Sequence, residues 1–100
     1  MKKNNPDLQI LRKKIDKIDW EIAKLIAKRM KFSPKIAQAK IQQGLPLFQR
    51  SRLQDLLKVR SIWSKKFNLK RNFLLKIFKL IHDESLENQK KTTLILKKKR

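Results

Sequence analysis

The sequence contains no cysteine, one glycine and one histidine. Without cysteine there are no disulfides, no thiolate nucleophiles and no thiolate metal ligands. One glycine cannot build the glycine-rich loops that cradle nucleotide phosphates. His82 has no second histidine with which to share a metal ion, so we interpret it as an interhelical or surface residue. With these kinds of site excluded, the basic side chains of a helical protein are the main candidates to carry its function.

Long apolar segments are also missing. No apolar run approaches the roughly 18 residues that a transmembrane helix needs. The basic start of the chain leads into no apolar signal segment. We therefore expect no membrane partner and a cytoplasmic location.

Acidic residues are scarce, because 8 Asp and Glu stand against 28 Lys and Arg, for a net charge of +20. This excess predicts a partner rich in negative charge, and nucleic acid is the first class to consider. The excess is mostly lysine and accompanies many isoleucine and asparagine residues, a bias that AT-rich coding produces without functional demand. Two interpretations are therefore kept: a basic surface that is only solvated, and a basic surface that has a function.

The first part of the chain carries a heptad pattern, and no stretch alternates between apolar and polar residues as a strand does. We expect one long helix over about residues 8–42, kinked at Pro34 and ended at Gly44. The alternative is that Ser33 and Pro34 begin a separate helix. The heptad seam is spaced 3-4-3-4-3-4 and consists of Leu8, Leu11, Ile15, Ile18, Ile22, Leu25 and Arg29.

Two shorter helices follow, one expected from Arg50 to Lys66 and one starting near Lys70. The predicted fold is therefore all-α, with one long and two shorter helices per chain. We place a helical domain at residues 1–91 and a basic tail, frayed or disordered, at 92–100.

The length of the first helix predicts an assembly. About 35 residues of helix extend about 52 Å, whereas a compact chain of this size has a radius of gyration of about 13 Å. Two shorter helices cannot cover a seam of that length, so we expect it to pack on a second chain. An intertwined two-fold homodimer is the predicted state.

Several polar residues interrupt the apolar stripes in register. Arg29 and Lys40 are eleven positions apart, about three helical turns, and share a face. Arg29 lies on the seam itself, where a cation is costly unless an anion meets it. Arg12 lies about a quarter-turn away from Arg29 and faces another surface, while Ser85 and Gln89 are one turn apart on the last helix.

Taken in order, these segments make the chain resemble the all-helical chorismate mutases from about Leu8 to Lys91. No single segment is diagnostic, but their order and spacing together are specific. The resemblance is carried by residues 11–19, 26–30 and 36–40, by Leu45-Pro46 before Arg52, and by residues 81–89.

The resemblance implies an isomerase that rearranges chorismate to prephenate in aromatic amino-acid biosynthesis, on the shikimate pathway. This pericyclic reaction needs no metal and no cofactor, but it needs a dianion held in a compact conformer. The resemblance implies that Arg29 and Arg52 bind substrate carboxylates and that Arg12 reaches in from the other subunit. Ser85 would add a hydrogen bond, and Lys40 and Gln89 would be the catalytic residues that flank the ether oxygen.

Two positions depart from the family pattern. Leu53 follows Arg52 where many members carry Glu, and Gln49 stands where Asp is common. In the family those acidic groups contact the ring hydroxyl, so here Gln49, Gln54 or backbone groups would have to replace that contact, or the substrate differs. The related isochorismate-pyruvate lyases share the fold and also have an apolar residue after that arginine, so a lyase is the first alternative.

A second alternative is a non-enzymatic, basic helical dimer that binds nucleic acid. It would place Lys and Arg on an exposed face and would leave seam residue Arg29 without a purpose. Aromatic residues fit the apolar stripes better than they fit a stacking platform. We therefore consider a nucleic-acid partner the less favoured reading.

Overall fold

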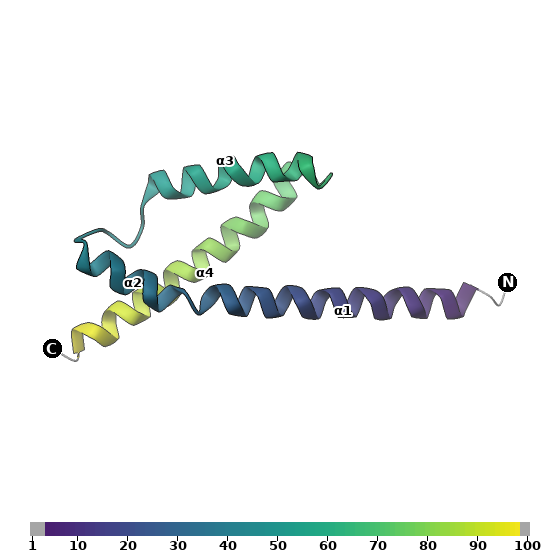
Figure 1. The fold of residues 1–100 in the computed structure, drawn as a ribbon, viewed down its shortest axis with the longest axis horizontal. Helices are drawn as coiled ribbons and strands as arrows, with labels where there is room; N and C mark the ends of the chain where they lie inside the picture. The colour runs from purple at the N-terminus through teal and green to yellow at the C-terminus, as the bar shows by residue number, and fades with distance from the viewer. Residues whose placement is uncertain (1–3, 99–100) are drawn as a thin grey trace.

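The computed structural model describes residues 4–98, which form four helices and, over that range, no strand. Helix α1 spans Asn4–Met30, α2 Ser33–Gln42, α3 Arg50–Lys66 and α4 Arg71–Lys98 (Figure 1). The prediction of an all-α fold is confirmed. None of the described helices is long and apolar enough to cross a membrane.

Helices α1 and α2 together form the predicted long helix, and the kink is a two-residue turn at Lys31 and Phe32. Pro34 has no N–H to donate to the carbonyl of Met30, four residues earlier, which is where α1 ends. Phe32 keeps helical dihedral angles (φ −79°, ψ −16°), and its carbonyl accepts the Ile36 N–H at 2.9 Å. The break therefore bends the helix without reversing it.

Two left-handed residues end the middle helices. Gly44 has φ 68°, and the following Leu45 N–H donates to the Lys40 carbonyl at 2.8 Å. Asn68 has φ 55°, and the following Leu69 N–H donates to the Ser64 carbonyl at 2.8 Å. Both are Schellman-type ends, which glycine and asparagine tolerate best. They turn the chain so that α3 and then α4 fold back toward α2.

Helix α4 is longer than the sequence predicted. It continues without a break to Lys98, so residues 92–98 are helical rather than a frayed or disordered tail. No glycine or proline follows Asn68 to stop the helix, and the Thr92 and Thr93 hydroxyls donate to carbonyls one turn earlier. The helix has no boundary at residue 91, and the division into domain and tail stays a prediction.

The packed part of the chain is small and excludes most of α1. Helix α4 packs mainly against α2 and α3 and touches α1 less. Among the described residues, the buried apolar side chains are Ala37 on α2, Leu56 on α3 and Leu74 on α4. The chain measures 67 × 30 × 14 Å, with a radius of gyration of 18.7 Å. Figure 1 shows α1 extending well beyond the other helices. The apolar seam residues of α1 are between 45% and 60% exposed in the single chain.

Candidate active site

A cavity of about 460 Å³ opens where the α1–α2 turn faces α3 and α4. Its size lies within the range of small-molecule sites. Each helix contributes to its wall, which consists of Arg29, Phe32, Ile36, Lys40, Gln49, Arg52, Leu56, Arg60, His82, Ser85 and Gln89.

The cavity brings together six of the seven residues singled out from the sequence: Arg29, Lys40, Gln49, Arg52, Ser85 and Gln89. Arg29 stands at the end of α1 and Lys40 near the end of α2, so the turn between them has not separated the two cations. Gln49 directly precedes α3 and Arg52 lies in its first turn. Ser85 and Gln89 are buried on α4, 7% and 4% exposed.

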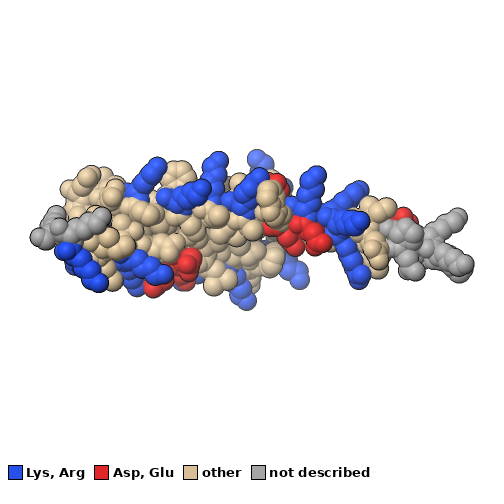
Figure 2. Space-filling model, turned by 90° about the horizontal axis from the view of Figure 1, so that it is seen from below, with Lys and Arg blue, Asp and Glu red and all other residues tan. Residues whose placement is uncertain are grey.

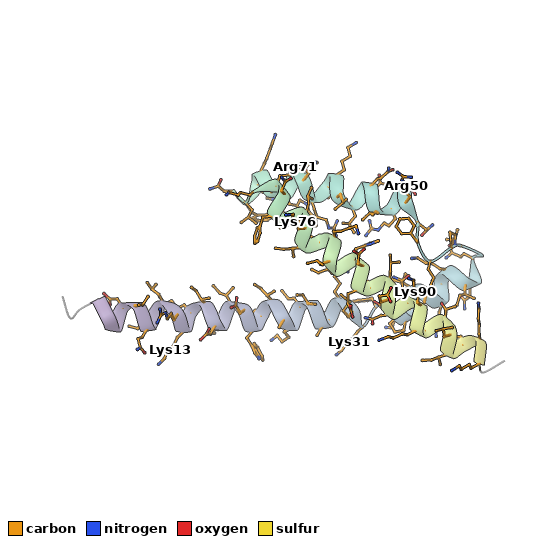
Figure 3. All side chains as sticks on the ribbon, turned by 180° about the vertical axis from the view of Figure 1, so that it is seen from behind. Lys13, Lys31, Arg50, Arg71, Lys76 and Lys90 are labelled. Carbon is orange, nitrogen blue, oxygen red and sulfur yellow. The ribbon has the colours of Figure 1, made fainter. Side chains whose placement is uncertain are left out.

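Arg12 is the residue that the chain does not bring to its own cavity. It is exposed on α1, and seventeen residues of helix separate it from Arg29, a distance of about 25 Å. Figure 3 shows the neighbouring Lys13 on the part of α1 that extends away from the other helices. Within one chain, Arg12 and the cavity are therefore far apart.

A chain of hydrogen bonds crosses the cavity from Lys40 to Ser33. The Lys40 ammonium donates to Gln89 Oε1 at 2.8 Å and also to the backbone carbonyl of Leu47. Gln89 Nε2 donates to Ser85 Oγ at 3.2 Å, and Ser85 Oγ lies 2.9 Å from Ser33 Oγ. Buried polar groups are costly unless paired, so this network fixes α4 against α2. It also leaves one N–H of the Gln89 amide free to meet a ligand.

The cavity wall, as the described residues form it, is cationic and holds no carboxylate. Burial lowers the pKa of Lys40, and the nearby charge of Arg52 lowers it further. The same two causes, in the same order, lower the pKa of Arg29. Among the described side chains, no Asp or Glu lies within ion-pair distance of Arg29 or Arg52. Such a site is complementary to a small anion with more than one negative charge.

The sequence analysis missed five residues of the wall, and two of them are chemically informative. Arg60 interrupts the apolar stripe of α3 one turn after Leu56, the same signal that marked Arg29. His82 is interhelical, 9% exposed, with Nδ1 3.7 Å from Asp83 and no hydrogen-bond partner. Burial lowers its pKa below the ordinary histidine value, and the interaction with Asp83 opposes that shift. The other three are Phe32, Ile36 and Leu56.

Known proteins resemble this chain over most of its length. Residues 11–90 match the family described as chorismate mutase type II. A bifunctional chorismate mutase/prephenate dehydratase of Buchnera aphidicola from Acyrthosiphon pisum is 38% identical over 87 residues, which are 87% of this chain and 23% of that protein. A chorismate mutase of Methanocaldococcus jannaschii is 35% identical over an alignment of 82 positions, which covers 79% of this chain and 82% of that protein.

The bifunctional relatives are much longer than the matched region, since the chain spans 23% and 22% of the two from Buchnera aphidicola. The archaeal chorismate mutase, by contrast, is covered over most of its length. The family match covers the α1–α2 turn, α3 and most of α4, the elements that form the cavity. The chain belongs to the chorismate mutase type II family.

Proposed function

We propose that the protein is a chorismate mutase, an isomerase that converts chorismate to prephenate in aromatic amino-acid biosynthesis. The observation that carries the proposal is the convergence of Arg29, Arg52 and the Lys40–Gln89 pair on one cavity without a carboxylate. Family membership supports the same activity. The proposed catalytic domain is residues 1–91, which include every cavity residue, and a cytoplasmic location stays a prediction.

The proposed mechanism relies on binding geometry, since the rearrangement breaks the C–O bond of the ether and forms a C–C bond within one molecule. Arg29 and Arg52 would each hold a carboxylate of the dianion, because a guanidinium fork matches a carboxylate in geometry and charge. Fixing both carboxylates selects the compact conformer in which the two reacting carbons meet. Ser85 would add a hydrogen bond to a carboxylate.

Lys40 and the free N–H of Gln89 would stabilise the negative charge that develops on the ether oxygen in the transition state. Their 2.8 Å contact sets both groups at one side of the cavity. The bond from Lys40 to the Leu47 carbonyl holds the ammonium in place before the ligand arrives. A preorganised donor pair of this kind accelerates the reaction because it needs no rearrangement when charge develops.

We also propose the intertwined homodimer, in which Arg12 of each chain enters the cavity of the other. Two observations support it: the uncovered apolar seam of α1 and the distance between Arg12 and its own cavity. A two-fold partner packed along α1 would bury the seam and bring its own Arg12 to the open side of the site. Arg12 would then be a further carboxylate-binding residue.

The isochorismate-pyruvate lyase stays the second candidate, because the cavity offers no carboxylate to read the ring hydroxyl of chorismate. Gln49 is the neutral group at that position. A nucleic-acid partner is less favoured. Figure 2 shows Lys and Arg exposed along the face that it draws, as that alternative expects. Arg29, however, is part-buried in the cavity wall, where a nucleic-acid binder would have no use for it.

The deciding experiment offers the purified protein chorismate and isochorismate in parallel. Loss of chorismate's ultraviolet absorbance with formation of prephenate is the expected result. Release of pyruvate from isochorismate without turnover of chorismate would replace the mutase by the lyase. Turnover of neither, by a folded protein, would contradict both enzyme proposals.

A further inference from the structure

Arg60 is a cation of the cavity wall for which the proposed reaction has no use. It lies on α3 one turn beyond Leu56 and two turns beyond Arg52, so all three share the face that looks onto α4. Arg29 and Arg52, together with Arg12 of the partner subunit in the proposed dimer, are assigned to the two carboxylates of the proposed substrate, and Lys40 is assigned to the ether oxygen. The structure nevertheless places a further guanidinium beside them.

Two aromatic rings lie against the Arg60 guanidinium but give its N–H groups no hydrogen-bond acceptor. Its Cζ lies 4.5 Å from the ring centroid of Trp63 and 5.1 Å from that of Phe78. The two rings themselves meet edge to face at 5.9 Å. Ring faces attract the cation but do not replace hydrogen-bond acceptors, and the Arg60 Nε is buried without any partner. A buried donor left unpaired is costly, but Nε is enclosed, so a ligand in the cavity that Arg60 lines can reach the guanidinium only through its terminal N–H groups.

The neighbouring charges also favour an anionic ligand at Arg60. The pKa of Arg60 is lowered by burial first, then by Arg52 and by Arg29, which means that the three guanidiniums repel one another. Within the described part of the chain, none of the three has a carboxylate within ion-pair distance. Lys40, in contrast, already donates to Gln89 and to Leu47. Of the three arginines that one chain contributes to the cavity, a dianion leaves one without a counter-charge, whereas a trianion leaves none.

We propose that Arg60 is a third anion-binding arginine of the cavity, and that the cavity therefore binds small tricarboxylates in preference to dicarboxylates of similar length. Such tricarboxylates would compete with the substrate for the same arginines. The inference rests on the proposed function in one respect, that Arg29 and Arg52 each take one carboxylate. The third carboxylate would meet Arg60 at the Trp63 and Phe78 end of the site.

The test compares two probes that differ by one carboxylate, glutarate and propane-1,2,3-tricarboxylate, in titration calorimetry at pH 8 and constant ionic strength. The unmodified protein should bind the tricarboxylate about tenfold more tightly, since one charge-assisted hydrogen bond is worth about that factor. Arg60→Leu should bring the two affinities to within about twofold of each other. Arg60→Lys, which keeps the charge but loses the fork, should fall between.

Arg50→Leu is the matched control, because Arg50 is an exposed arginine of the same helix that does not line the cavity. It removes the same charge and should leave the tenfold preference intact. Circular dichroism establishes that each variant is folded, and Arg60→Gln takes the place of Arg60→Leu if the apolar variant does not fold. Equal binding of the two probes to the unmodified protein would overturn the proposal. So would a preference that survives loss of Arg60, or one that Arg50→Leu removes equally.

Chorismate turnover measured on the same samples separates this inference from the proposed function. Competitive inhibition by the tricarboxylate, weakened in Arg60→Leu, is expected if both hold. An Arg60-dependent preference in a protein without turnover would leave the inference standing and remove the proposed reaction. Turnover of chorismate with no Arg60-dependent preference would support the proposed reaction and overturn the inference about Arg60.

Discussion

Replacing Lys40 by methionine removes one ammonium from the cavity and little else. Methionine is unbranched and of similar length, so it fills the same space between α2 and α4. Two hydrogen bonds disappear, to Gln89 Oε1 at 2.8 Å and to the Leu47 carbonyl. If Lys40 stabilises charge on the ether oxygen, the change acts on the transition state and much less on the bound substrate.

The magnitude follows from the contacts. Loss of one preorganised donor at a developing negative charge lowers kcat by about 10²–10³. KM should change by only a few fold, because Arg29 and Arg52 still hold the carboxylates. Gln89 is 4% exposed and loses the donor to its Oε1. An unsatisfied buried acceptor costs about 1–3 kcal/mol, and we expect the lower end because the Gln89 amide still reaches Ser85.

Absorbance-monitored turnover gives kcat and KM, and chemical denaturation gives the free energy of unfolding. Lys58→Met is the control, since Lys58 is exposed on α3 and outside the cavity. It should leave both quantities unchanged. A folded Lys40→Met protein with kcat within about threefold of the unmodified enzyme would refute the position of Lys40 at the ether oxygen. A fall confined to KM would instead make Lys40 a carboxylate-binding residue.

Three further predictions concern Arg29, Arg12 and the protonation of Lys40. Arg29→Ala should lower kcat/KM by a factor of about 10² or more without loss of helicity, because Arg29 has no ion pair among the described residues; full activity would remove it from the site. Equal amounts of Arg12→Ala and Arg29→Ala chains, unfolded and refolded together, should recover about a quarter of all sites, since half of the dimers are mixed and each has one intact site; no recovery would exclude a shared site. Finally, kcat/KM should fall as pH rises through the lowered pKa of Lys40, which lies below the ordinary lysine value of about 10.5. A bound dianion favours the ammonium, so kcat should fall only at higher pH, and an identical alkaline fall in Lys40→Met would contradict the assignment.

Helical periodicity predicted the elements because it depends only on local register. The heptads of α1, the span Arg50–Lys66 of α3 and the stop at Gly44 follow from spacing and backbone preference alone. The extent of α4 did not follow. Its lysine-rich end was predicted to fray, yet residues 92–98 contain neither glycine nor proline to stop a helix that is already formed.

The cavity was predictable only in part, for a physical reason. Arg29 and Lys40 are eleven positions apart, which is about three helical turns, so the sequence alone predicts that they share a face. Arg60 and His82 face the same cavity only because α3 and α4 pack side by side, and no local pattern specifies which turns of the two helices meet. Arg60 did carry a local signal, a cation on an apolar stripe, which is the criterion that identified Arg29.

The single chain has two features that are each unfavourable in free energy. Its cavity concentrates part-buried cations that repel one another, and its longest helix leaves an apolar seam uncovered. Helix α1 connects the two, since its last turn carries Arg29 into the cavity while its seam and Arg12 face outward. In the proposed dimer one packing event covers the seam and brings Arg12 to the partner's cavity, which adds still more positive charge there. An anionic ligand would supply compensating charge, because the cavity wall formed by the described residues of one chain contains no carboxylate. Assembly of the dimer and binding of the anion should therefore be coupled, each favouring the other.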